Sequence, residues 1–466
     1  MNEFLKTLSL VALITPTSVF ADELLPHQHV ARDVLEEMIS IKSVAFDGAT
    51  KIIAENTYKR LIEAGFKDED VKIIGPEENN KGLWVRYRGA VGGQKPILTL
   101  AHLDIVNALP EDWTLPPFSL IEQEGYFYGR GVEDNKAGAA TLVSTFIRLK
   151  EEGFKPNRDI IMWLSSDEED TADSTKWILE NHKDMVDAEY ALNTDAGGGT
   201  LRDGVGVNYS VQASEKIYVT FNFDVRNKGG HSSVPPKGNA IYYLADALKN
   251  LEAYSFPIKT NEVTRSYFKA LSEKASPEMK GLMVEASKED GNPDVFESLA
   301  ETSWFNATLR TTCVATMLHG GHAENALPQL ARATVNCRVL PNSDPDEVEA
   351  TLREITNPDG GNLVEVIRIY EPTLSPPSPI REDVFKAITF AIHNDYPDAT
   401  IIPNMSTGAT DGLYFRNAGI PVYGTSGLFG DENTGGAHGQ NENILVESYY
   451  QAQDHWYEIL KKLTGI

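Results

Sequence analysis

Two segments of the chain share one layout, a short apolar run followed by imidazole or carboxylate side chains: Pro96-Ile-Leu-Thr-Leu-Ala-His-Leu-Asp104 and Asp159-Ile-Ile-Met-Trp-Leu-Ser-Ser-Asp-Glu-Glu169. A helical pattern of apolar residues occupies 137–151 between them, and a second helix near 172–181 precedes an apolar strand at 190–194. Strands that alternate with helices predict an α/β fold, with a mainly parallel sheet covered by helices on both faces.

The chain has 466 residues. A single hydrophobic core is usually too small for a chain of this length, so we expect two domains. The pattern changes near residue 213, and a proline cluster at 372–379 marks the return of the first pattern. Between these points we expect a strand at 217–225, a helix at 239–251, a largely helical polar stretch at 255–310, a strand at 331–340, a helix at 346–355 and a strand at 363–370. We therefore predict a catalytic domain in two parts, 22–212 and 375–466, interrupted by an inserted α+β lid or dimerisation domain at 213–374.

Residues 1–21 have the layout of a secretory signal peptide. Lys6 precedes a small and apolar stretch, and Val19-Phe-Ala21 resembles a cleavage site. The alternative is an apolar N-terminal helix. The signal peptide predicts a secreted or periplasmic protein, and no later stretch is apolar and long enough to cross a bilayer.

The formal net charge is −26, which argues against nucleic acid or an anionic membrane as a partner. The two cysteines, Cys313 and Cys337, exclude a disulfide scaffold and a cysteine-rich zinc cluster. Both lie in strand-like stretches. We expect two buried free thiols; the alternative is a disulfide between neighbouring strands, which requires close Cα atoms.

Candidate metal ligands stand just beyond the predicted strands or in glycine-rich loops. They are His102 and Asp104 after the strand at 96–101, Asp134 in the loop GRGVEDNK, Glu168 and Glu169 after the strand at 159–165, Asp195 after the strand at 190–194, and His438 in the loop GGAHGQNE. Because open α/β sheets bind ligands at the carboxyl ends of their strands, these residues can converge. Imidazoles and carboxylates suit zinc, cobalt or manganese, and a carboxylate that bridges two cations holds them about 3.5–4 Å apart.

The motifs HLDIV, GRGVEDNK, SSDEE, GGHSSVP, ENALP and HGQNEN follow one another between about residue 100 and residue 442. This ordered set, which covers most of the chain, resembles the aminoacylase/carboxypeptidase family of di-zinc metallopeptidases (peptidase family M-twenty). The long lid insert and the stretch RTTCVATMLHGGHAENALP are similar to the secreted or vacuolar carboxypeptidase and N-acyl-amino-acid hydrolase branch.

The resemblance implies two zinc ions per subunit. His102 and Asp195 would bind one zinc, Glu169 and His438 the other, and Asp134 would bridge them. Asp104 would hydrogen-bond the free ring nitrogen of His102. Glu168 would act as general base, taking a proton from the bridging water and passing it to the leaving amine. The resemblance also implies a cis peptide bond between Asp134 and Asn135.

In the lid, the resemblance implies that His231 donates a hydrogen bond to the developing oxyanion, from the partner subunit of a homodimer built through the lid. Asn325 would assist it. Arg338 and the backbone at Gly408 would hold the carboxylate of the substrate. The alternative for Arg338 is a surface ion pair.

Together these features predict a zinc hydrolase that cleaves an amide bond next to a free carboxylate. The substrate would be a peptide, for a carboxypeptidase or dipeptidase, or an N-acyl amino acid, for a deacylase. A third possibility is a zinc-dependent peptide-binding protein without catalysis. The presence of Glu168 beside intact ligands argues against it, since a binding protein needs no base.

Overall fold

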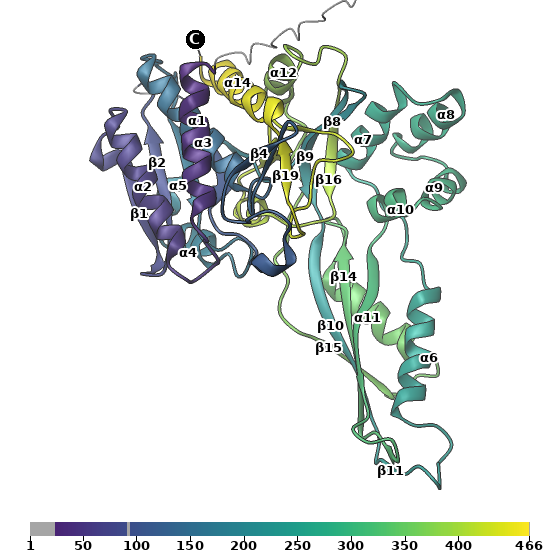
Figure 1. Cartoon of the computed structure of the whole chain (residues 1–466). Helices are drawn as coiled ribbons and strands as arrows, with labels where there is room; N and C mark the ends of the chain where they lie inside the picture. The colour runs from purple at the N-terminus through teal and green to yellow at the C-terminus, as the bar shows by residue number, and fades with distance from the viewer. Residues whose placement is uncertain (1–23, 91–93, 466) are drawn as a thin grey trace, which may run out of the picture.

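The computed structural model of the protein describes residues 24–90 and 94–465. The predicted signal peptide at 1–21 lies outside the described residues. Figure 1 shows a broad α/β body from which a second, elongated sheet extends. Among the described helices, none combines the length and apolar character needed to cross a membrane.

A central sheet of ten strands, counted over the described residues, forms the body. In spatial order it contains β1 (Val71–Glu77), β2 (Asn80–Tyr87), β6 (Ile160–Ser165), β3 (Ile97–His102), β7 (Tyr190–Asn193), β17 (Val422–Gly424), β9 (Val205–Glu215), β8 (Gly198–Arg202) and β18 (Phe429–Gly430), and β16 (Thr400–Ser406) pairs with β9. Strand β3 runs parallel to both β6 and β7, and β17 runs parallel to β7. The predicted α/β fold with a mainly parallel sheet is confirmed.

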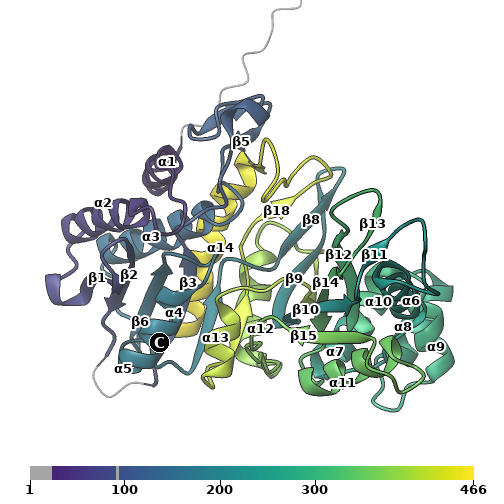
Figure 2. The ribbon, with the colours of Figure 1, turned by 90° about the horizontal axis from the view of Figure 1, so that it is seen from below.

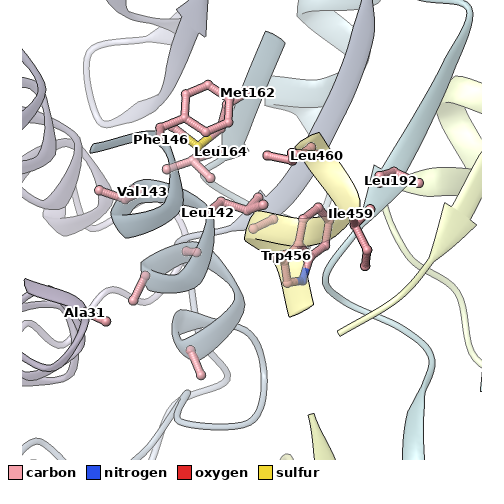
Figure 3. Close-up of a cluster of buried hydrophobic side chains, with 14 of the residues drawn as sticks. Ala31, Leu142, Val143, Phe146, Met162, Leu164, Leu192, Trp456, Ile459 and Leu460 are labelled. Carbon is pink, nitrogen blue, oxygen red and sulfur yellow. The ribbon is translucent and has the colours of Figure 1, made fainter. Parts of the chain in front are cut away.

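Helices cover both faces of this sheet. One face carries α1 (Pro26–Ser40), α2 (Ala49–Glu63), α3 (Lys136–Glu151), α12 (Glu382–Ile392) and α14 (Val446–Thr464); the other carries α4 (Asp173–Asn181), α5 (Lys183–Val186) and α13 (Gly412–Asn417). Every residue of β3 and β6 is buried, because both faces of these strands are covered. Figure 3 shows Phe146 of α3 and Trp456 of α14 in the first of these cores.

The second sheet, called the lid sheet below, is antiparallel. Its order is β12 (Thr312–Gly320), β14 (Leu330–Val339), β10 (Ile217–Arg226) and β15 (Val364–Arg368). Helices α6 (Ala240–Ala253) and α11 (Pro345–Thr356) pack on one face, where Val219, Phe221 and Phe223 form part of a separate core. Because side chains alternate along a strand, residues 218, 220, 222 and 224 lie on the opposite face.

The predicted helical stretch at 255–310 forms four helices: α7 (Glu262–Ser272), α8 (Pro277–Ala286), α9 (Pro293–Ala300) and α10 (Ser303–Leu309). Their apolar side chains, Phe268 and Leu299 among them, share a core with Ile402 of β16. Figure 1 shows α7 beside β16, and Figure 2 shows α8, α9 and α10 close together on the same side of the molecule. These helices therefore pack against the central sheet. They add no strand to the lid sheet, so β12 is an edge strand of that sheet.

The prediction of two free thiols is wrong. Cys313 of β12 and Cys337 of β14 form a disulfide, with their Cα atoms 4.1 Å apart. The register of the two strands places these residues directly opposite each other. Strand register depends on tertiary packing, so the sequence alone did not predict this pairing.

Candidate metal centre

Three of the predicted ligands follow parallel neighbouring strands, so the sheet topology brings them to one edge. His102 is the last residue of β3, Glu169 follows β6 and Asp195 follows β7. The other two come from loops: Asp134 precedes α3, and His438 precedes β19 (Asn443–Leu445). Strand β19 pairs with β5 (Tyr126–Tyr128), which in turn pairs with β4 (Ile121–Gln123), and this small sheet places the two loops side by side.

The structure brings all five predicted ligands together in two groups that share Asp134. One group is His102, Asp134 and Asp195, and the other is Asp134, Glu169 and His438. Oδ1 of Asp134 lies 2.9 Å from Nε2 of His102, and its Oδ2 lies 3.2 Å from Nε2 of His438. One carboxylate thus presents an oxygen to each imidazole, the arrangement expected of a bridging ligand. The predicted cis peptide bond between Asp134 and Asn135 is also confirmed.

Burial, hydrogen bonds and neighbouring charges shift the ionisation of these groups. Burial raises the pKa of Asp195 to about 7. Burial and the charge of Asp195 hold the pKa of Glu168 well above its usual value. The hydrogen bond to Asp134 raises the pKa of His438 to about 9. In each case the raised pKa favours the protonated form of the side chain. Divalent cations bound to these side chains would take the place of the protons.

The donor set fits a pair of zinc ions. Each group offers one imidazole nitrogen and carboxylate oxygens, which zinc binds readily, and a shared carboxylate is typical of two-metal hydrolases. Nδ1 of His102 lies 3.1 Å from the backbone carbonyl of Asp104. This contact places the ring proton on Nδ1 and leaves the lone pair of Nε2 for a metal.

The Asp104 side chain lies beside His102, where the resemblance places it, and also contacts the next turn. Its carboxylate lies 3.5 Å from Nδ1 of His102, farther than the backbone carbonyl. Its two oxygens accept the backbone N–H groups of Glu168, at 3.1 Å, and Glu169, at 3.0 Å. Asp104 therefore positions the turn that carries the predicted base and one predicted ligand.

Two other buried carboxylates, Asp167 and Glu442, support the centre, and neither was predicted to have a role. Asp167 accepts hydrogen bonds from the backbone of Asp173 and Ser174 at the start of α4, which fixes the turn that contains Glu168. Glu442 accepts backbone N–H groups from the loop that carries Asp134. Glu442 stands within the quoted motif HGQNEN, which was the available signal; nothing local marked Asp167 as buried.

The predicted carboxylate-binding residues also meet, although they come from the two sheets. Nη1 of Arg338, on β14, donates to the backbone carbonyl of Thr407 at 3.1 Å, next to Gly408. The N–H of Gly408 donates to Oγ of Ser406 at 3.0 Å. The same loop continues to Asp411, which hydrogen-bonds Ser165 at the end of β6. Arg338 therefore lies against a loop that borders the strand leading to Glu168.

His231 and Asn325 lie together but apart from the metal ligands. His231 belongs to β11 (Gly230–His231), which pairs with β13 (Ala326–Leu327), and the backbone of Ser232 donates to Asn325. Figure 1 shows β11 at the free end of the lid sheet, far from the central sheet. His231 is exposed and does not reach the metal centre of its own chain in this structure.

A cavity of about 430 Å³ opens beside the centre, lined by Asp134, Asp195, the glycines at 197–199 and Leu428. Its lining includes two of the five predicted metal ligands.

Comparison with known proteins gives consistent matches. Residues 98–462 match the family model described as peptidase family M20/M25/M40. The N-fatty-acyl-amino acid synthase/hydrolase PM20D1 of Xenopus tropicalis is 30% identical over 370 residues, covering 78% of this chain and 71% of that protein. Carboxypeptidase S of Saccharomyces cerevisiae is 26% identical over 433 residues, covering 82% and 74%. The structure of an M20 family metallo-carboxypeptidase from Sulfolobus solfataricus has the same fold, with a TM-score of 0.70 at 21% identity, covering 93% of this chain and 99% of that one.

Proposed function

The chain belongs to peptidase family M20/M25/M40, and from this premise we propose that it is a two-zinc hydrolase that cleaves an amide bond next to a free carboxylate. The observation that carries the proposal is the position of Asp134, shared between two groups of metal-binding side chains. Glu168 lies near enough to Asp195 and His102 of these groups for their charges to affect its pKa. A carboxypeptidase or dipeptidase is the first candidate. Hydrolysis of N-acyl amino acids is the second, supported by the similarity to the Xenopus tropicalis enzyme.

In the proposed mechanism, His102 and Asp195 would hold one zinc, Glu169 and His438 would hold the other, and Asp134 would be a ligand of both. Bound metal would polarise the scissile carbonyl and make water more acidic. Glu168 takes a proton from the attacking water and delivers it to the leaving nitrogen. The carboxylate of Asp104 accepts the backbone N–H of Glu168 and so holds Glu168 in place.

Recognition of the substrate carboxylate falls to Arg338. Its guanidinium is held by Thr407 and by Asn336, whose Oδ1 lies 3.3 Å from Nε of Arg338. Among the described residues no carboxylate forms an ion pair with Arg338, which leaves the charge for a ligand. This geometry supports carboxylate binding over the alternative of a surface ion pair.

A homodimer through the lid is part of the proposal. Strand β12 is an edge strand with exposed apolar side chains, Val314 at 61% and Leu318 at 65% exposure, and α6 exposes Tyr242 beside it. An unpaired apolar edge of this kind favours strand pairing with a second copy. Such pairing would also provide a route for His231 to reach a partner's metal centre.

Secretion is proposed from the sequence of residues 1–21. The Cys313–Cys337 disulfide supports it, because structural disulfides persist in oxidising compartments such as the periplasm or the extracellular medium.

The test compares the zinc-loaded protein acting on Gly-Leu, N-acetyl-leucine and the carboxamides of both. We expect the free acids to be cleaved, and amidation to raise KM and lower kcat together, since binding of the carboxylate helps align the scissile amide. The ratio of rates for the two acids separates peptidase from deacylase. Equal cleavage of acids and amides would contradict carboxylate recognition. If the protein with both metals bound cleaves none of these compounds, the remaining candidate is a peptide-binding protein without catalysis.

A further inference from the structure

The open face of the lid sheet is a ladder of polar pairs between β10 and β14. Asp224 forms an ion pair with Arg332, and Nδ2 of Asn336 donates to Oγ1 of Thr220 at 3.2 Å. Asn222 accepts a hydrogen bond from Thr334 in the row between them. These rows satisfy their own polar groups, so they offer little to a ligand.

The row nearest the central sheet is different. Tyr218 lies directly opposite Arg338, and the guanidinium carbon is 4.5 Å from the centre of the tyrosine ring. The ring of Tyr370, just beyond β15, stacks on Tyr218 with an interplanar angle of 8° and a centroid separation of 6.2 Å. The hydroxyl of Tyr370 lies 3.1 Å from Oγ1 of Thr220, which fixes its position.

These two rings are available to a ligand. Tyr218 is 41% exposed and Tyr370 is 45% exposed, although both are held by neighbours. Cation–π contact with Arg338 orients Tyr218 without covering the rest of its surface. The two rings thus offer apolar surface next to a guanidinium that forms no ion pair among the described residues, so one ligand with a carboxylate and an apolar group could contact both.

From this juxtaposition we propose that Tyr218 and Tyr370 form the subsite for the side chain of the carboxyl-terminal residue, and that they select an aromatic or large aliphatic residue there. The inference rests on the proposed function, in which Arg338 holds the α-carboxylate. In an amino acid the side chain leaves the same carbon that bears the carboxylate. A carboxylate on Arg338 therefore brings that side chain into reach of the ring stacked over the guanidinium.

The chemistry of the subsite explains the preference. Tyrosine faces gain free energy from covering apolar or aromatic surface, and they carry no formal charge to pair with a charged side chain. Glycine would leave the rings uncovered, and a glutamate or lysine would lose hydration without gaining an ion pair there.

The experiment measures kcat/KM for Gly-Phe, Gly-Leu, Gly-Gly and Gly-Glu, and for the N-acetyl derivatives of the same four carboxyl-terminal residues. Within each series the acyl group is constant, so ratios report only the carboxyl-terminal side chain. We expect Phe and Leu to exceed Gly by at least about tenfold. Tyr370→Ala should lower the Phe-to-Gly ratio about tenfold, and Tyr370→Phe should retain it. Phe390→Ala, which removes an exposed ring from α12, is the matched control.

The outcomes separate the inference from the function on which it rests. If no free acid is cleaved, the proposed function fails. If free acids are cleaved but the Phe-to-Gly ratio stays near one in the wild type, the subsite proposal is overturned while the function stands. A Tyr370→Ala variant that slows all substrates equally also overturns it, because the ring would then only support Arg338.

Discussion

Oε1 of Glu442 accepts the backbone N–H of Asp134 at 3.0 Å, across 308 positions of sequence. Oε2 of Glu442 accepts a hydrogen bond from Nη1 of Arg130 at 2.7 Å. Nη2 of Arg130 donates to the backbone carbonyl of Gly439, the residue after His438. A single buried carboxylate therefore joins the loop of the shared ligand to the loop of the last ligand. Glu442 is fully buried, so these bonds are not replaced by water if they are lost.

We expect Glu442→Gln to weaken metal binding about 10- to 100-fold, the range seen when groups that orient metal ligands are changed. An amide nitrogen cannot accept the N–H groups that the carboxylate accepts, so part of the loop loses its partner. Metal titration monitored by calorimetry measures the change, and circular dichroism checks the fold. Glu447→Gln, an exposed change on α14, is the control. Equal affinities for wild type and Glu442→Gln would show that the loop needs no such support.

Asp134→Ala should lose at least one of two zinc ions per chain, together with activity. Each group would keep only two of its three ligands, and the shared contact would be absent. Metal analysis of the purified wild type should give two ions per chain. A fully active enzyme with a single tightly bound ion would rule out the two-metal mechanism.

Glu168→Gln should leave the zinc content unchanged and reduce kcat by at least about a thousandfold, in the upper range for general acid–base catalysis. Glutamine keeps the size of the side chain but cannot accept the proton. Parallel metal analysis and steady-state kinetics give both numbers. Activity within tenfold of the wild type would exclude Glu168 as the base.

Local patterns located several candidate metal ligands, and the family resemblance selected five of them, with Asp134 as the shared ligand. An apolar run marks each strand, and His102 and Glu169 follow such runs at the edge where parallel strands end together. The disulfide could not be predicted, because it depends on the register of β12 against β14. Glu442 was missed for a different reason. The sequence does not distinguish a buried glutamate from an exposed one, and the N–H groups that Glu442 binds are known only from the folded backbone.

The aromatic subsite illustrates the same limit. Tyr218 and Arg338 lie opposite each other through strand pairing, and Tyr370 joins them from a segment after β15. The alternation of β10 predicts only that Tyr218 lies on a face away from the core. Which residues of distant segments share that face is decided by the antiparallel pairing of three strands.

His231, which we propose as the oxyanion donor, lies at the free end of the lid sheet. The backbone N–H of Ser233 donates to its Nδ1 at 3.1 Å, so the neutral ring carries its proton on Nε2. That N–H is directed away from the Ser233 contact and can serve a partner subunit. The alternative is a monomer in which a hinge motion brings the lid onto its own metal centre.

Mixing two inactive variants separates these cases. Glu168→Gln keeps His231, and His231→Ala keeps Glu168. If His231 acts across a two-fold dimer, each hybrid dimer contains one site with both residues intact. Random exchange of equal amounts makes half of the dimers hybrid, so about a quarter of the wild-type activity should return. If His231 acts within its own chain, every site in a hybrid lacks one residue. No recovery after subunit exchange has been verified by mass spectrometry would therefore exclude the trans arrangement.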